Sequence, residues 1–313
     1  MNKEKWSVVI PTYNRLPILT KCLRSLENQD FEQEYEVIVI DDGSTDGTVE
    51  FLQTHTNEFP HVKLFQRDHQ GASIARNTGV EVATGEIILF IDSDLVSMPG
   101  SLTAHARALE GQDKAFTYGR IVNTSNFDDP TSEPFTLTDV SNAYFATGNT
   151  AIAKHWFIEA GGFDPDFKQY GWEDLELGVR LKNMGFKIIK CPKALGYHWH
   201  PPFTMDEVPK LIDVEKQRGR MGAIFYQKHP TWDVRMIIQM TWLHKALWGL
   251  LSFGGALNER SLKPILQFLI DRNRPQLALE IARIFLNWYS VQAVYDAYAQ
   301  ASQTKPTSQS ATS

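Results

Sequence analysis

The feature that most constrains the fold is a run of five apolar residues, 87–91, followed directly by Asp92-Ser93-Asp94. An uninterrupted apolar run of this length is typical of a strand that is covered on both faces in the centre of a parallel sheet. Two carboxylates, one residue apart, then stand where this strand leaves the sheet. Such a pair can attract a divalent cation that holds a diphosphate, although a lone Asp-x-Asp is more often a solvated turn.

Strand and helix patterns alternate in the first half of the chain. Apolar runs that indicate strands lie at 6–10, 35–40, 62–65 and 87–91. Helical patterns lie between them, at 16–26, 46–52 and 73–82. Strands alternating with helices at this spacing predict a parallel sheet, whose ligands bind at the carboxyl edge.

The second half of the chain has a different organisation. A polar loop is expected at 123–142, followed by a helix at 154–160, a helix at 173–183 and a strand at 186–191. After Pro201-Pro202 helical patterns dominate, and four Trp residues are spread among them. The segment 301–313 is rich in Ser, Thr and Gln, which predicts disorder.

The charge balance argues against nucleic acid as a partner. The 313 residues carry a formal net charge of -6, and no run of Lys or Arg interrupts this balance. Cys22 and Cys191 match no metal or redox spacing, which suggests a reducing compartment. The apolar run 8–10 is too short for a signal peptide, so we expect a cytoplasmic protein.

Four polar segments follow predicted strands or open a helix. They are Pro11-Thr12-Tyr13-Asn14, Asp41-Asp42-Gly43-Ser44, Asp92-Ser93-Asp94 and Trp172-Glu173-Asp174. Together with the phrases VVIPTYNR, VIVIDDGSTDGT, GASIARNTG, ILFIDSD, GGFD and GWEDLELGVRL, they make residues 6–200 resemble the family 2 glycosyltransferases. The last phrase, with a downstream His, is also similar to galactosyltransferase and N-acetylgalactosaminyltransferase domains.

The resemblance implies an α/β protein with the GT-A fold, which is Rossmann-like with a mostly parallel central sheet. It also implies transfer of a sugar from a nucleotide diphosphate with inversion. We expect a catalytic domain at 1–204, with a nucleotide half at about 1–95 and an acceptor half at about 96–204. A helical C-terminal region at 205–300 and the disordered tail at 301–313 would follow.

The nucleotide is expected at the first three turns. Tyr13 can stack on a pyrimidine ring, and Asp42 can accept a hydrogen bond from an imide N–H, which favours uracil. Arg76 would face the same edge and neutralise diphosphate charge. The resemblance adds nucleotide-binding roles for Pro11, Thr12, Asn14, Asp92 and Ser93. The structural alternatives are that Tyr13 packs, Asp42 forms a turn and Arg76 is a surface residue.

The resemblance also implies a divalent cation, Mn²⁺ or Mg²⁺, coordinated by Asp94. Such a cation would offset the charge that develops on the leaving UDP. In related enzymes a His near the position of His198 completes the metal shell, and a His ligand favours Mn²⁺. We expect His198, but His200 would point the same way from an extended chain. Both rings could instead simply pack among the aromatic residues of this segment.

Glu173 and Asp174 are the expected catalytic pair. Inversion needs a carboxylate that takes the proton of the acceptor hydroxyl as its oxygen attacks the anomeric carbon. Family precedent makes Asp174 this base and Glu173 an orienting residue, although acidic residues also stabilise the first turn of a helix. Trp172 could stack on a sugar, and Gly148 and Asn149 are expected to line the acceptor side.

The apolar stretch 237–257 allows three interpretations. Gln239, His244 and Lys245 in its middle disfavour a membrane span. The stretch could be a helix packed on the catalytic domain. It could also be a helix that lies in a membrane surface and brings the enzyme to a lipid-linked acceptor.

The motifs together predict a metal-dependent inverting glycosyltransferase of polysaccharide biosynthesis. Its donor would be a nucleotide diphosphate sugar, expected to carry UDP, and its acceptor a saccharide or glycolipid, with Asp174 as base. It would be cytoplasmic or peripheral at the inner face of the cell membrane. The alternatives are a catalytically silent nucleotide-sugar or carbohydrate-binding protein on the same fold, and a sugar-phosphate nucleotidyltransferase. The second would need a Gly-rich basic loop, which 11–14 is not.

Overall fold

The structure is a computed structural model that describes residues 4–134 and 144–303. The chain divides into two compact units. The first, here called the sheet unit, comprises Met1–Pro165 and Glu173–Pro201. The second, here called the helical unit, comprises Asp166–Trp172 and Pro202–Ser313.

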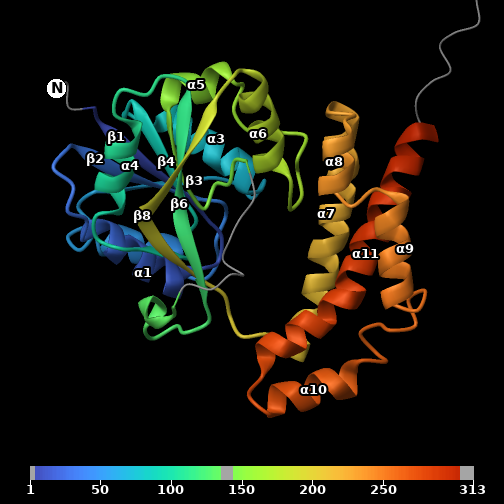
Figure 1. Ribbon diagram of the computed structural model, residues 1–313. Coiled ribbons are helices and arrows are strands. Elements are labelled where there is room, and N and C mark those ends of the chain that lie inside the picture. The colour runs from blue at the N-terminus through green and yellow to red at the C-terminus, as the bar shows by residue number, and fades with distance from the viewer. Residues whose placement is uncertain (1–3, 135–143, 304–313) are drawn as a thin grey trace, which may run out of the picture. The chain divides into compact units, whose positions relative to one another are not determined.

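A mixed sheet of eight strands forms the centre of the sheet unit, in the order β3-β2-β1-β4-β7-β6-β8-β5 (Figure 1). The strands are β1 (Trp6–Thr12), β2 (Tyr35–Asp41), β3 (Val62–Gln66), β4 (Ile87–Ile91), β5 (Leu95–Ser97), β6 (Ala115–Thr124), β7 (Asn149–Ala153) and β8 (Lys187–Trp199). Four of the seven described strand pairings are parallel. They include all three pairings among β1, β2, β3 and β4. The four strands predicted in the first half are therefore confirmed, and they form the parallel half of the sheet.

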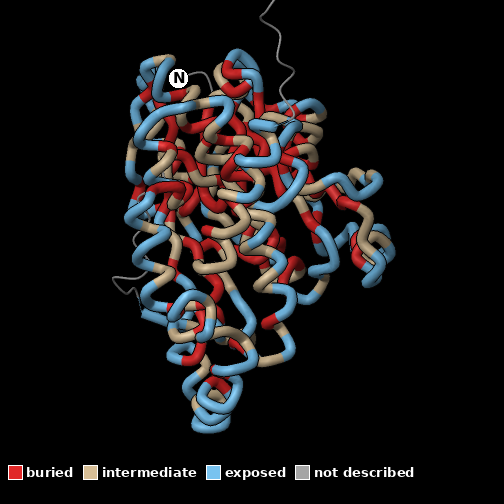
Figure 2. Tube along the Cα trace, turned by 90° about the vertical axis from the view of Figure 1, so that its right-hand side faces the viewer, coloured by how far each residue is buried: buried red, intermediate tan, exposed pale blue. Residues whose placement is uncertain are grey.

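Helices cover both faces of this sheet. They are α1 (Leu16–Glu27), α2 (Thr48–Thr54), α3 (Ala72–Val82), α4 (Ser101–Leu109), α5 (Lys154–Glu159) and α6 (Glu173–Asn183). Alternate residues of β1 enter two cores: Val8 packs with residues of α1, and Val9 packs with residues of α3 and α6. All five residues of β4 are buried, as the apolar run predicts; buried positions are red in Figure 2.

A glycine sets the distance between α3 and the sheet. A Cβ added to Gly79 would lie 2.4 Å from Cγ1 of Val9, so only glycine fits at this contact without a shift. Gly79 thus lets α3 lie against β1. The same helix carries Arg76 one turn earlier, at the carboxyl edge of the sheet.

The expected polar loop at 123–142 is described only in part. Strand β6 continues through Thr124, and Pro130–Ser132 form a short 3-10 helix, η1. Residues 135–143 lie outside the described residues.

Helices make up the described structure of the helical unit after a short 3-10 turn, η3 (Met205–Glu207). They are α7 (Val208–Lys228), α8 (Trp232–Ile237), α9 (Trp242–Leu251), α10 (Lys263–Asp271) and α11 (Pro275–Gln303). Helices α7 and α11 approach each other closely at Gly219. A Cβ added to this glycine would lie only 2.5 Å from the carbonyl oxygen of Ser290, so the absence of a side chain permits the contact. Helix α11 includes 301–303, where the composition predicts disorder, while 304–313 lie outside the described residues.

The apolar stretch 237–257 is not a continuous helix. Gln239 has a positive φ of 58°, and the chain turns there between α8 and α9. Among the described helices, none combines the length and the hydropathy that crossing a bilayer would require.

We predict that His105 makes the sheet unit less stable in acid. The fully buried imidazole of His105 contacts Oγ1 of Thr117 at 2.7 Å and Oδ1 of Asn149 at 2.9 Å, and burial lowers its pKa to about 4. Because an unfolded His titrates near 6.5, the unfolded chain binds the extra proton between these two values. The free energy of unfolding should therefore fall by roughly 2 kcal/mol from pH 7 to pH 4.5 on this account.

Urea unfolding of wild type and His105→Gln at both pH values would measure this contribution. The Gln variant should be less stable at pH 7 but should lose about 2 kcal/mol less on acidification. Equal losses in the two proteins would contradict a neutral, buried His105.

Candidate active site

The turn between β4 and β5 carries Asp92-Ser93-Asp94. It is closed by the amide of Leu95, which donates to the carbonyl oxygen of Asp92 at 3.0 Å. Ser93 and Asp94 are buried, whereas Asp92 is partly exposed. The turn stands at the carboxyl end of β4, where the sequence predicts it.

Asp92, Asp94 and His198 bring one possible ligand atom each within 4.8 Å of one another. Sheet register explains the meeting, because Leu95 of β5 pairs with His198 of the antiparallel β8. Nε2 of His198 lies 2.8 Å from Oδ1 of Asp94. The ring of His200 lies edge-to-face against His198 at 4.1 Å, and His200 is not a member of the group.

Opposite charge surrounds Asp94. Burial alone would raise the pKa of Asp94, but the hydrogen bond from His198 and the charges of His198 and Arg15 lower it to about 2. Burial lowers the pKa of His198, yet its contact with Asp94 outweighs burial and the net shift is upward. Two carboxylates and an imidazole suit Mn²⁺ or Mg²⁺, so the donor set fits such a cation.

Arg15 is a site residue that the sequence motifs did not single out. It precedes α1, and its guanidinium donates to Oδ2 of Asp94. Its place as the last residue of VVIPTYNR, directly after the predicted nucleotide turn, is the signal that could have identified it.

Arg76 joins the Asp92 turn to the helix that carries the predicted catalytic pair. Its Nη2 lies 2.7 Å from Oδ1 of Asp92, and its Nη1 lies 3.5 Å from Oε1 of Glu173. Arg76 is only 6% exposed, so it is not a surface residue. Burial lowers its pKa, but the carboxylates Asp92, Glu173 and Asp174 raise it overall. Within the described residues, Nη1 of Arg76 and Oε2 of Glu173 are buried without a hydrogen-bond partner.

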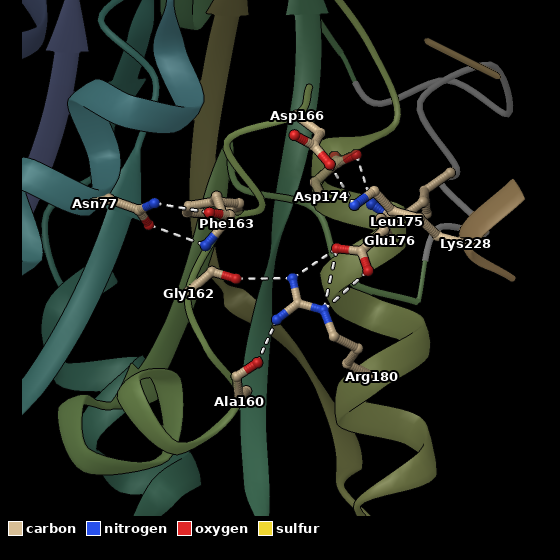
Figure 3. Close-up of polar contacts among 10 residues, drawn as sticks. All are labelled: Asn77, Ala160, Gly162, Phe163, Asp166, Asp174, Leu175, Glu176, Arg180 and Lys228. Carbon is tan, nitrogen blue, oxygen red and sulfur yellow. Dashed lines mark hydrogen bonds and ion pairs between the residues drawn. The ribbon is translucent and has the colours of Figure 1, made fainter. Parts of the chain in front are cut away.

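Asp174 lies in the first turn of α6, beside Glu173. Burial raises the pKa of Asp174 to about 7, and the negative charge of Glu173 adds to this shift. Oδ1 of Asp174 accepts a hydrogen bond from the amide of Leu175 at 2.7 Å (Figure 3). The residue as a whole is partly exposed, while its carboxyl is desolvated.

Residues 160–163 form hydrogen bonds with side chains of both α6 and α3. Arg180 of α6 pairs with Glu176 and donates to the carbonyl oxygens of Ala160 and Gly162 (Figure 3). Asn77 of α3 binds the same loop through its side-chain amide. Its Nδ2 donates to the carbonyl oxygen of Phe163 at 2.7 Å, and its Oδ1 accepts from the backbone N–H of Phe163 at 2.9 Å (Figure 3). The motif GGFD is therefore a structural connector.

Tyr13 and Asp42 lie at the same edge of the sheet. The ring of Tyr13 is 44% exposed and stacks on His69, with ring centres 4.3 Å apart. Oδ2 of Asp42 accepts from the amide of Gly71 at 2.8 Å, and Oδ1 accepts from the amide of Gln70 at 3.1 Å. Asp42 thus fixes the segment before α3, and a bond to uracil would share its oxygens with these donors.

Hydrogen bonds of Asn14 join the turn after β1 to the turn after β2. Asn14 has a positive φ of 52°, and its Oδ1 accepts from the amide of Thr45 at 2.7 Å. The backbone N–H of Asn14 donates to Oγ of Ser44 at 2.9 Å. Thr12 is buried at the end of β1 and Pro11 is partly buried.

Asn149 does not line an acceptor site. It is fully buried in β7, where Oδ1 contacts His105 and Nδ2 donates to the carbonyl oxygen of Ala194 at 2.9 Å. Both ends of its amide are therefore used within the core, and the predicted acceptor role is wrong. Gly148 borders Asp92, since a Cβ on it would lie 3.1 Å from Oδ2 of Asp92.

Trp172 is held by α7 of the helical unit, to which it belongs. Its Nε1 donates to the carbonyl oxygen of Arg218 at 2.7 Å, and the Arg218 guanidinium lies 5.4 Å from the ring centre. This cation covers the ring, which limits the stacking predicted for Trp172.

Comparisons with known proteins show the family to which the chain belongs. The sequence model of glycosyl transferase family 2 matches residues 7–165, and that of the N-terminal domain of galactosyltransferase matches 131–202. The glycosyltransferase AglE of Haloferax volcanii is 39% identical over 256 residues, which cover 79% of this chain and 80% of AglE. The hyaluronan synthase of Pasteurella multocida is 28% identical over 72% of this chain, which spans only 28% of that enzyme.

Solved structures show the same fold at low sequence identity. A mannosyltransferase of Pyrobaculum calidifontis, in complex with GDP-Man and Mn²⁺, has a TM-score of 0.57 at 20% identity, covering 97% of this chain and 88% of its own. GalNAc-T7 with UDP, GalNAc and Mn²⁺ has a TM-score of 0.54 at 18% identity, covering 69% and 48%. The predicted GT-A fold is confirmed, and the chain is a transferase enzyme that belongs to glycosyl transferase family 2.

Proposed function

We propose that this enzyme is a metal-dependent, inverting glycosyltransferase. Its donor would be a UDP-sugar, and its acceptor a hydroxyl of a saccharide or glycolipid. Two sets of contacts carry this proposal: His198 pairs with Asp94, and Arg76 joins Asp92 to Glu173, which is beside Asp174. The two sets meet where Asp92, Asp94 and His198 bring possible ligand atoms within 4.8 Å of one another. Together they link a cation-binding group to a desolvated carboxyl within the sheet unit.

Asp174 is the proposed general base. A carboxyl with a pKa of about 7 is substantially ionised at neutral pH and is more basic than an ordinary Asp. It would take the proton of the acceptor hydroxyl while the hydroxyl oxygen bonds to the anomeric carbon. As this bond forms, the bond between the anomeric carbon and the diphosphate oxygen breaks, and the diphosphate keeps its electrons.

The donor diphosphate is proposed to lie at the Asp92 turn. Asp94 and His198, with Asp92 beside them, would hold Mn²⁺ or Mg²⁺, which supplies positive charge to the leaving group. Arg15 and Arg76 add two guanidinium groups to the same region. Neighbours that contain UDP or GDP-Man with Mn²⁺ support a nucleotide and a metal here.

The nature of the acceptor is proposed from the relatives. The matched proteins include a hyaluronan synthase, a chondroitin synthase and a validoxylamine A glucosyltransferase. These names support a saccharide acceptor and polysaccharide biosynthesis. A silent binding protein would have no need of the desolvated Asp174, and family membership argues against a nucleotidyltransferase.

We predict that UDP binding requires both a divalent cation and Asp94. Calorimetric titration of wild type with UDP in Mn²⁺ should give binding that EDTA removes, because the diphosphate would otherwise face Asp92 and Asp94 directly. Asp94→Asn should weaken UDP binding in Mn²⁺ by at least about tenfold, since one charged ligand is lost. GDP in place of UDP should bind more weakly if Asp42 and Tyr13 select uracil.

The exposed Asp113, which lies outside the site, provides a matched control. Asp113→Asn should bind UDP as wild type does. Equal binding of UDP and GDP would contradict uracil selection, and UDP binding that survives EDTA would contradict the metal site.

We predict that Asp174→Asn abolishes turnover and leaves UDP binding intact. Loss of a general base lowers kcat by about 10²–10⁴. In wild type, kcat should rise with pH through about 7, because Asp174 must be deprotonated to act. Glu173→Gln should move this transition to lower pH, since it removes a neighbouring negative charge that raises the pKa of Asp174. Retained turnover in Asp174→Asn would refute the assignment.

We also predict that Asp174→Asn stabilises the protein in mild alkali. The pKa of Asp174 is higher in the folded state (about 7) than in an unfolded chain (about 4), so folding favours the protonated carboxyl. Its contribution to stability is therefore lost as pH rises through this interval. The variant should gain on the order of 2 kcal/mol at pH 8 and little at pH 4, as measured by urea unfolding. A loss of stability at pH 8 would show that the ionised carboxyl is stabilised in the fold.

A further inference from the structure

Helix α9 presents an apolar surface that the other described helices of the helical unit do not cover. Of its ten residues, none is buried. The helix is nonetheless almost wholly apolar, with the sequence WLHKALWGLL. Leu250 and the nearby Phe253 are each 73% exposed, and Trp242 is 71% exposed. Exposed apolar surface of this kind marks a site of interaction.

The exposed leucines form one stripe along the helix. At 100° per residue, Leu243, Leu247, Leu250 and Leu251 fall within an arc of about 100°. The opposite side contacts α11, which lies beside α9 in Figure 1. Nζ of Lys245 lies 4.9 Å from the ring centre of Tyr295, and Gly249 faces the ring of Trp288. The stripe therefore faces away from α11.

The segment that contains the stripe is basic in an otherwise acidic protein. Residues 235–274 carry six basic side chains, Arg235, Lys245, Arg260, Lys263, Arg272 and Arg274, against two acidic ones, Glu259 and Asp271. The segment therefore has a formal charge of +4, and the rest of the chain has -10. Five of the six basic residues are exposed.

We propose that the leucine stripe of α9, with Trp242 and Phe253, docks this enzyme on an anionic lipid surface. Apolar side chains enter the acyl boundary, while Trp rings and basic groups lie at the level of the head groups. Each basic residue near such a surface adds attraction to anionic lipid. The enzyme would then act next to a membrane while no described helix crosses it.

Charge distinguishes this occupant from a second copy of the chain. Two copies facing one another through α9 would bring two segments of +4 together, and like charges oppose that contact. An anionic lipid surface instead offers both apolar volume and opposite charge. The combination of stripe and cations therefore favours lipid.

Vesicle flotation of the full chain tests the proposal. Wild type should float with vesicles of phosphatidylcholine and phosphatidylglycerol, and should bind pure phosphatidylcholine vesicles much less. The double variant Leu247→Ser/Leu250→Ser should lower the partition coefficient by about tenfold or more, since two exposed apolar side chains are lost. Arg260→Glu/Lys263→Glu should lower binding to anionic vesicles only, and added salt should do the same.

Ile158 of α5 is the matched control, because it is 58% exposed and lies in the sheet unit. Ile158→Ser should float as wild type does, and all variants should keep the helix content of wild type by circular dichroism, which shows that they are folded. Wild type that ignores anionic vesicles would overturn the proposal. Equal flotation of the Leu247→Ser/Leu250→Ser variant would do so as well. A third result would also overturn the proposal: light scattering that shows wild type as a dimer and the Leu247→Ser/Leu250→Ser variant as a monomer. A second copy of the chain would then cover the stripe.

Discussion

The buried guanidinium of Arg76 is the contact on which the site depends. Three carboxylates, Asp92, Glu173 and Asp174, act on this one cation. Without it, the turn after β4 and the first turn of α6 would bring like charges together with little water to screen them. Arg76 reaches this position because Gly79 allows α3 to lie against Val9 of β1. A packing constraint in the core thus determines the electrostatics of the site.

The pKa values of two carboxyls in the sheet unit shift in opposite directions, although burial raises both. Asp94 meets His198 and Arg15, and its pKa falls to about 2. Asp174 meets Glu173, and its pKa rises to about 7. The first stays ionised, as the proposed metal ligand must, and the second can exchange a proton near neutral pH, as the proposed base must. Divergent pKa values of this kind separate a binding carboxylate from a base.

Local patterns predicted β1 to β4, the turns after them and α6, but not β5 or β6, because apolar period and punctuation are encoded over a few residues. Long-range pairing could not be predicted in this way. His198 and His200 are equivalent in an extended chain, and only the register of β5 against β8 brings His198 to Asp94. Asn149 was misassigned for the same reason, since its partner His105 lies 44 residues away and nothing local marks the pair.

Gly171 and Trp172 determine the backbone conformation just before Glu173 and Asp174, the proposed catalytic pair. Gly171 and Trp172 both have positive φ, of 108° and 76°, and a bulky residue such as Trp adopts this conformation only with strain. The indole bond to the carbonyl of Arg218 and the covering guanidinium offset that strain. Trp172 belongs to the helical unit and Glu173 to the sheet unit, so the peptide between them joins the two. The backbone conformation of Trp172, directly before α6, is therefore stabilised by contacts within the helical unit.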